Sequence, residues 1–289
     1  MIPQLATQIS DVRARVADAR AQGQRIGFVP TMGALHGGHA SLMACARAET
    51  DYRIVSIFVN PMQFGPQEDY VHYPRSPQED LELCASQAVQ LIFAPDSTTI
   101  YPPGFRTSVE VEGLQDSWEG TSRPGHFRGV ATVVIKLLNI IQPDVVYFGQ
   151  KDAQQLILLR RVVRDLDLPV MVRMCPTIRE PDGLAMSSRN RYLTPDQRRQ
   201  ATVLYEALEL GRQLIERGER DPAFIEKEMD RLIASRPMAR ADYVAVVKWE
   251  ELEPLKQITG DVLLALAVRF GSARLIDNVI VEAIDGRKL

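Results

Sequence analysis

Through residues 1–178 the chain alternates between two hydrophobic patterns, short apolar runs and longer segments with apolar residues every three or four positions. The spaced pattern predicts helices, as where Ile9, Val12 and Val16 share one face. Alternation with apolar runs favours an α/β fold, a Rossmann-like, doubly wound parallel sheet with helices on both faces. The predicted helices are 1–23, 41–49, 76–88, 129–142 and 152–166, and the apolar runs are 25–30, 52–60, 89–95, 107–112, 144–149 and 169–178.

The pattern changes after residue 190. A long amphipathic helix is predicted over 195–219, opened by Thr194 as N-cap and Pro195 at the first helical position. A second helix, 222–235, and three β-rich runs follow, without the strand–helix–strand rhythm of the first part; the runs are 241–248, 260–270 and 273–282. We therefore expect a sheet domain over 1–177 and a smaller α+β domain over 178–289.

Length, composition and charge fit a globular enzyme of more than one domain. The chain has 289 residues, 45% of them hydrophobic and 25% charged, which is enough apolar material for a sizeable core. A net charge of −3 gives no basic footprint for nucleic acid or an anionic membrane. The N-terminal segment does not resemble a signal peptide, and no apolar run approaches the roughly 18 residues of a membrane span. A cytoplasmic location is therefore expected.

Cys45, Cys84 and Cys175 lie far apart in the sequence. They form no CxxC pair and no Cys/His metal spacing, so neither a disulfide framework nor a structural zinc site is expected. Their apolar surroundings predict buried, inert thiols.

The segment from Met32 to His39 reads Met-Gly-Ala-Leu-His-Gly-Gly-His and lies between the first long apolar run and the next helix. In a parallel sheet this loop falls at the carboxyl edge, where such folds bind ligands. Its glycines allow a phosphate to approach the backbone, and the following helix offers free N–H groups. His36 and His39 can donate hydrogen bonds to phosphate oxygens and stabilise a departing pyrophosphate. An exposed Gly-rich turn or a metal-binding pair is the alternative, although no carboxylate or cysteine stands at metal-ligand spacing nearby.

Ser187, Ser188 and Arg189 follow the last apolar run of the predicted sheet domain. Small hydroxyls beside a permanently charged planar guanidinium suit a loop that binds a triphosphate. Taken alone this segment is more typical of a solvated loop. Its combination with the paired histidines favours the triphosphate-binding interpretation.

Lys151 follows the apolar run 144–149 and can meet a phosphate at the same sheet edge. Gln155 lies one helical turn further on and faces the same end. The alternative is an ordinary helix cap, since Asp152 opens a helix well.

Asn60 and Gln63 follow the run 52–60 and offer neutral amides that can bind a hydroxy acid. Turn chemistry explains the Asn-Pro pair equally well. Tyr73 lies in a polar loop, where an ordinary turn is likewise the alternative to a binding role.

Together these segments resemble the pantothenate synthetases (pantoate–β-alanine ligases), which belong to the nucleotidylyl transferase superfamily related to class I tRNA synthetases. The resemblance covers nearly the whole chain. The matching segments are PTMGALHGGH (30–39), FVNPMQFGPQEDY (58–70), YPRSPQEDL (73–81), RPGHFRGVATVVIKLLNIIQPD (123–144), FGQKDAQQL (148–156) and PTIREPDGLAMSSRNRYL (176–193).

The resemblance implies a two-step reaction that consumes ATP. The carboxylate of pantoate attacks the α-phosphorus to give pantoyl adenylate and pyrophosphate, and the amine of β-alanine then displaces AMP. It also implies Mg²⁺ bound mainly through the ATP phosphates and water, a homodimer, and a C-terminal domain that acts as a lid.

The resemblance further assigns roles to residues. His39 is expected to act as general acid with His36 as its partner, and Lys151 and Arg189 complete the catalytic set. Pantoate or β-alanine is expected at Gln63, Gln155, Asn60 and Tyr73. The residues expected to bind ATP are Met32, Gly33, Ala34, Leu35, His36, Gly37, Gly38, His39, Gly149, Gln150, Lys151, Asp152, Ile178, Met186, Ser187, Ser188 and Arg189.

Two other functions fit part of the pattern. Another nucleotidyltransferase with a His-x-Gly-His turn would share the phosphate residues but would not need the amides at Asn60, Gln63 and Gln155. A catalytically silent nucleotide-binding regulator would have no reason to keep both histidines together with Lys151 and Arg189. The ligase is therefore the favoured function.

Overall fold

A computed structural model describes residues 2–65 and 70–282, so residues 66–69 of the family-like segment 58–70 lie outside the described part. The chain divides into two compact units. The sheet unit comprises Met1–Gln150 and Gln155–Pro176, and the C-terminal unit comprises Lys151–Gln154 and Thr177–Leu289. Within the described ranges no helix has both the length and the apolar character needed to cross a membrane.

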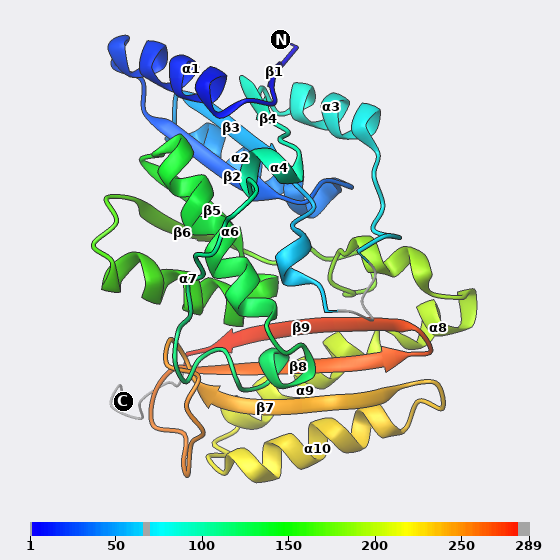
Figure 1. The fold of residues 1–289 in the computed structure, drawn as a ribbon. Coiled ribbons are helices and arrows are strands. Elements are labelled where there is room, and N and C mark those ends of the chain that lie inside the picture. The colour runs from blue at the N-terminus through cyan, green and yellow to red at the C-terminus, as the bar shows by residue number, and fades with distance from the viewer. Residues whose placement is uncertain (1, 66–69, 283–289) are drawn as a thin grey trace. The chain divides into compact units, whose positions relative to one another are not determined.

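The sheet unit contains six parallel strands in the order β1-β4-β3-β2-β5-β6 (Figure 1). From β2 the strands β3 and β4 follow in chain order on one side and β5 and β6 on the other, while β1 pairs with β4 at the edge. This order confirms the predicted doubly wound sheet. The switch point lies between β2 and β5, and ligands of such sheets bind beyond the carboxyl ends of the strands there. The strands are β1 (Gln4–Ala6), β2 (Ile26–Thr31), β3 (Tyr52–Ile57), β4 (Leu91–Phe93), β5 (Val145–Gly149) and β6 (Met171–Cys175).

Both faces of this sheet are buried. Val29, Val55 and Ile92 belong to one core cluster with residues of α2, while Phe28 and Ile54, which alternate with them, are also buried. Helix α2 packs against β2, β5 and β6, and α1 packs on α6. The helices are α1 (Ile9–Ala21), α2 (Gly37–Glu49), α3 (Pro77–Ser86), α4 (Ser97–Ile100), α5 (Glu119–Ser122), α6 (His126–Ile141) and α7 (Ala153–Asp165).

Two segments of the sheet unit differ from the sequence patterns. Residues Gln4–Ala6, which the helical pattern included in 1–23, form β1, because they pair with β4. The apolar run 107–112 forms no strand; the backbone N–H of Val109 instead donates to the Thr132 hydroxyl at 3.0 Å. In both cases a partner distant in the sequence decides the local structure.

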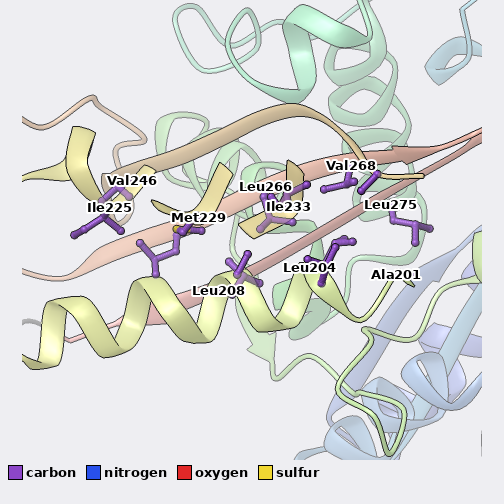
Figure 2. Packing of buried hydrophobic residues seen from close by; sticks show 14 of the residues in the cluster. Ala201, Leu204, Leu208, Ile225, Met229, Ile233, Val246, Leu266, Val268 and Leu275 are labelled. Atoms are coloured by element: carbon purple, nitrogen blue, oxygen red, sulfur yellow. The ribbon is translucent and has the colours of Figure 1, made fainter. Parts of the chain in front are cut away.

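The C-terminal unit is an antiparallel sheet of β7 (Arg240–Lys248), β8 (Val262–Phe270) and β9 (Ala273–Val281), packed against two helices. The predicted helix 195–219 is divided by a turn at Ala201–Thr202. Figure 2 shows Leu208 and Met229 among the residues that join helices to strands in this core. The helices are α8 (Pro195–Gln200), α9 (Val203–Glu216) and α10 (Pro222–Ala234).

The cysteines only partly match the expectation of buried thiols. Cys84 and Cys175 are buried, but Cys45 on α2 is partly exposed, so the expectation is wrong for Cys45. Burial, with a smaller effect of Asp80, raises the pKa of the Cys84 thiol to about 12. Burial also raises the pKa of Cys175, and a hydrogen bond with the Cys45 thiol adds to the rise.

These environments predict selective labelling. Thiolates are the reactive species, so a disulfide reagent at pH 8 should modify Cys45 first and leave Cys84 and Cys175 unmodified until the protein unfolds. Spectrophotometric thiol counting before and after denaturant measures this, and Cys45→Ser should remove the fast phase. Rapid labelling of Cys84 in the native Cys45→Ser protein would contradict the prediction.

Candidate active site

The loop after β2 turns sharply through two residues with left-handed backbone. Gly33 has φ 84° and Ala34 has φ 50°. This conformation suits glycine but costs an ordinary L-residue about 1–2 kcal/mol. A Cβ at Gly33 would also lie 3.0 Å from both Asp80 Oδ2 and Ile57 Cγ2. The turn therefore requires glycine first and a stabilising contact for Ala34.

Asp80 supplies that contact from α3. Its carboxylate accepts the backbone N–H of Ala34 at 3.1 Å on Oδ2 and that of Leu35 at 2.7 Å on Oδ1. The residue is 1% exposed, so these charge-assisted hydrogen bonds form away from water. The buried carboxylate therefore holds the loop that leads directly into His36.

Asp80 was not singled out by the sequence patterns. The available signal was an acid on the same helical face as Cys84, four residues later, inside the family-like segment 73–81. An acid on a buried helical face needs a partner, and here the partners are backbone amides 45 and 46 residues earlier.

His36 and His39 form a capping arrangement at the start of α2. Nδ1 of His36 accepts the backbone N–H of Gly38 at 3.1 Å, and Nδ1 of His39 accepts the backbone N–H of His36 at 3.2 Å. The two ring centroids are 4.2 Å apart. The pair thus satisfies two of the amide donors that a helix start leaves without partners.

These hydrogen bonds fix the tautomer of both rings. A backbone N–H can only donate, so each Nδ1 must lack a proton, and each neutral ring carries its proton on Nε2. Both imidazoles are partly exposed. They follow β2 at the switch point and combine Nε2–H donors with the N-terminus of α2, an arrangement suited to phosphate oxygens.

Asn60 caps the short helix η1 (Pro61–Gln63) beyond β3, and Gln63 is its last residue. Asn60 is 1% exposed and donates from Nδ2 to Gln63 Oε1 and to the Gly129 carbonyl, both at 3.1 Å. Its Oδ1 accepts from the Met62 N–H at 3.2 Å and the Tyr101 hydroxyl at 2.8 Å. The Asn60 amide is therefore used within the protein, which favours a role in holding Gln63.

Gln63 links this amide group to the histidine loop. Its Nε2 lies 3.0 Å from Met32 Sδ, a weak acceptor. Helix α6 approaches closely from the other side, since a Cβ at Gly129 would lie 2.2 Å from the Met62 carbonyl oxygen. Glycine at 129 is thus needed for the position of Gln63.

His126 at the start of α6 supports the same turn. Its Nδ1 lies 2.8 Å from the Gln63 carbonyl oxygen, and its Nε2 lies 2.9 Å from Arg123 Nη1. A carbonyl accepts and a guanidinium donates, so this ring carries its proton on Nδ1. Tyr73 is buried, and the centroid of its ring lies 5.8 Å from that of Phe64, the residue after Gln63.

The remaining predicted residues of the sheet unit lie at the carboxyl end of β5 and on α7. Gly149 is the last residue of β5, and Gln150 opens the short helix η2 (Gln150–Asp152). Gln155 lies on α7 and is partly buried.

The other predicted residues belong to the C-terminal unit. Lys151 and Asp152 complete η2, and Ser188 and Arg189 lie in the short helix η3 (Ser188–Tyr192). The Ser187 hydroxyl accepts the Arg189 N–H at 3.2 Å, which leaves its own proton to be donated. The Met186 N–H donates to the Ile178 carbonyl at 2.9 Å, so the two predicted adenosine-pocket residues are joined directly.

Among residues 2–65 and 70–282, no group of three or more His, Cys, Asp or Glu side chains is arranged to hold a metal ion. The donors at the histidine loop are N–H groups, which suit an anion rather than a cation.

Comparison with known proteins gives a family match along the chain. The model of the family described as pantoate-beta-alanine ligase matches residues 4–280. A pantothenate synthetase of Moorella thermoacetica is 54% identical over 282 residues, covering 98% of this chain and 100% of that protein.

Solved structures give the same family. The crystal structure of pantothenate synthetase from Thermus thermophilus is 46% identical with a TM-score of 0.91, covering 96% of this chain and 98% of that chain. Pantoate-beta-alanine ligase from Francisella tularensis, complexed with beta-gamma ATP and beta-alanine, is 36% identical with a TM-score of 0.77 and covers 96% of this chain and 97% of that chain.

The Asp80 contacts predict a local effect of Asp80→Asn. An amide has one acceptor oxygen, and its NH₂ group would face a backbone donor, so the free energy of unfolding should fall by about 1.5–3 kcal/mol. Amide hydrogen exchange at residues 33–36 should accelerate. Denaturant unfolding and exchange measure the two effects, and Glu79→Gln, an exposed acid in the same turn of α3, is the matched control. Equal effects of the two substitutions would refute the role of Asp80.

Proposed function

The chain belongs to the pantoate–β-alanine ligase family, and we propose that it forms pantothenate in two steps through a pantoyl adenylate. It is an ATP-dependent ligase whose substrates are ATP, pantoate and β-alanine. A free carboxylate is a poor acylating agent, and conversion of its oxygen into a phosphate leaving group removes that obstacle. Adenylylation therefore explains why ATP is consumed.

In the first step a carboxylate oxygen of pantoate forms a bond to the α-phosphorus, and the bond from that phosphorus to the bridging oxygen of the β-phosphate breaks. Pyrophosphate leaves with the electron pair. In the second step the neutral amine of β-alanine forms a bond to the acyl carbon, and AMP leaves. The proton lost by the amine passes to solvent.

The single observation that carries the proposed phosphate role is the capped pair His36 and His39. With both Nδ1 atoms accepting from the backbone, the proton of each neutral ring lies on Nε2, the nitrogen that can donate to a phosphate oxygen. Fixed donors aimed at developing charge stabilise a transition state more than mobile water does. We assign this donation to the departing pyrophosphate. A general-acid role for His39 stays a prediction, and the capped tautomer favours hydrogen-bond donation.

Lys151, Ser187, Ser188 and Arg189 are assigned to the triphosphate. The ammonium and guanidinium groups offset its charge, and the serine hydroxyls add short hydrogen bonds. The adenosine assignment of Gly149, Asp152, Ile178 and Met186 rests on the family resemblance.

For the acyl substrates, Gln63 and Gln155 are assigned to pantoate. The internal contacts of Asn60 support an indirect role, holding Gln63, and direct contact of Asn60 or Tyr73 with substrate stays a prediction.

Several wider assignments also stay predictions. Mg²⁺ is assigned to the ATP phosphates and water. The N–H groups of the described site would bind the phosphates, and the ion would take its oxygen ligands from the phosphates and water. A homodimer, a cytoplasmic location and a lid role for 178–289 follow from the resemblance and from composition. Light scattering at several protein concentrations measures the molar mass and thereby tests the homodimer.

The adenylate step predicts partial reactions. Labelled pyrophosphate should exchange into ATP with pantoate alone, and AMP should appear at the full rate only when β-alanine is added. Each substrate is omitted in turn as the control. AMP release that requires β-alanine, without any pantoate-dependent exchange, would argue for a concerted reaction instead.

Two substitutions separate the cap from the chemistry at His39. The oxygen of Asn can replace Nδ1 as the acceptor, whereas the NH₂ group of Gln can replace the Nε2–H donor. We expect His39→Asn to keep the free energy of unfolding but to lower kcat by at least about 100-fold, as for loss of one fixed donor. His39→Gln should keep more activity. If His39→Asn is the more active variant, the donor role is wrong.

A further inference from the structure

We propose that Asp277 and its neighbour Asn278 on β9 are positioning residues that together hold Lys151 and the hairpin leading to Ser187 and Arg189. The inference rests on the proposed triphosphate role of those residues. All the groups involved belong to the C-terminal unit. Neither Asp277 nor Asn278 is expected to touch substrate.

The two side chains are polar and buried in a strand whose other buried residues are apolar. Asp277 is 2% exposed and Asn278 is 3% exposed. Strand β9 pairs with β8 in continuous register, so successive side chains point to opposite faces. Leu275 and Val281 pack into the core of the unit, which places Asp277 on the helix-covered face and Asn278 on the other. Asp277 and Asn278 therefore contact two different segments, which contain Arg179 and Lys151.

Asp277 holds Arg179 in a forked ion pair. Its Oδ2 lies 2.5 Å from Arg179 Nη1, and its Oδ1 lies 3.1 Å from Nη2. The guanidinium also donates to the Gly183 carbonyl at 3.1 Å and lies 4.3 Å above the Tyr205 ring. Burial raises the pKa of the Asp277 carboxyl, while the hydrogen bonds and charge of Arg179 and the charge of Lys151 oppose the rise.

Arg179 fixes the hairpin before Ser187. Its backbone pairs antiparallel with Ala185, and the Glu180 N–H donates to the Leu184 carbonyl at 2.8 Å. The turn closes at Gly183, whose φ is 92° and where a Cβ would lie 2.2 Å from the Tyr205 ring. The Arg179 side chain therefore joins the turn of this hairpin to β9.

Asn278 supplies the second connection. Its Nδ2 donates to the Lys151 carbonyl at 2.9 Å, and its backbone N–H donates to Asp277 Oδ1 at 2.8 Å. Lys151 and Arg179 are distant in the sequence, yet each is bound to one of two consecutive residues. A buried carboxylate is costly unless it is fully paired, and this one is paired with the cation that orders the hairpin.

The test compares steady-state kinetics of Asp277→Asn with Asp242→Asn. The Asp242 carboxylate also pairs with two arginines, Arg269 at 2.7 Å and Arg274 at 2.6 Å, in the same unit. We expect Asp277→Asn to raise KM for ATP at least about tenfold, a loss of about 1.4 kcal/mol in binding, because the groups proposed to bind the triphosphate would be displaced. KM for β-alanine should change less than about twofold. Asp242→Asn should lower the Tm without changing KM for ATP. Equal KM values in both variants would overturn the inference.

Asn278→Ala and Lys151→Ala complete the experiment. Asn278→Ala removes the contact with Lys151 but leaves the buried ion pair, so it provides the kinetic test if Asp277→Asn does not fold, and it should also raise KM for ATP. Lys151→Ala tests the proposed function itself. If Lys151→Ala leaves ATP kinetics unchanged, the triphosphate assignment fails; if only Lys151→Ala changes them, the positioning role of β9 fails alone.

Discussion

One buried carboxylate, that of Asp80, determines the geometry of the histidine loop. By accepting the N–H groups of Ala34 and Leu35 it offsets the cost of a left-handed alanine. The loop then enters α2 with His36 as N-cap, and each histidine ring receives a backbone hydrogen bond. The Asp80 carboxylate thus orders the loop that leads into the two histidines whose tautomer places the proton on Nε2.

The two units use buried acids in the same way. Asp80 binds backbone amides in the sheet unit, and Asp277 binds a guanidinium in the C-terminal unit. In each case the acid fixes a segment whose residues are proposed to bind phosphate. Because the acid is buried, it adds no negative charge among the exposed donors of that segment. This separation is physically reasonable, since a carboxylate beside a triphosphate would repel it. Burial keeps the positioning charge away from the ligand charge.

The sheet and the histidine loop could be predicted because their signals are local. The runs 25–30 and 52–60 and the Gly-rich segment after the first of them contain their own periodicity and turn residues. Strand β1, in contrast, exists through its pairing with β4, and the Arg179 contact with Asp277 spans 98 residues. A polar pair inside the run 273–282 marks an unusual position, but no pattern in the sequence indicates its partners. The partners of buried polar groups that are distant in the sequence are therefore fixed by the tertiary fold and not by any local pattern.

The capped tautomer also bears on how His39 contributes to the reaction. An imidazolium carries protons on both ring nitrogens, so protonation of His39 would remove the acceptor for the His36 N–H. It would also place a cation at a helix N-terminus, where the backbone already presents positive potential. A neutral ring keeps the cap and still donates from Nε2 to a departing anion. The same backbone hydrogen bond that starts α2 thus favours charge stabilisation over proton transfer in the first step.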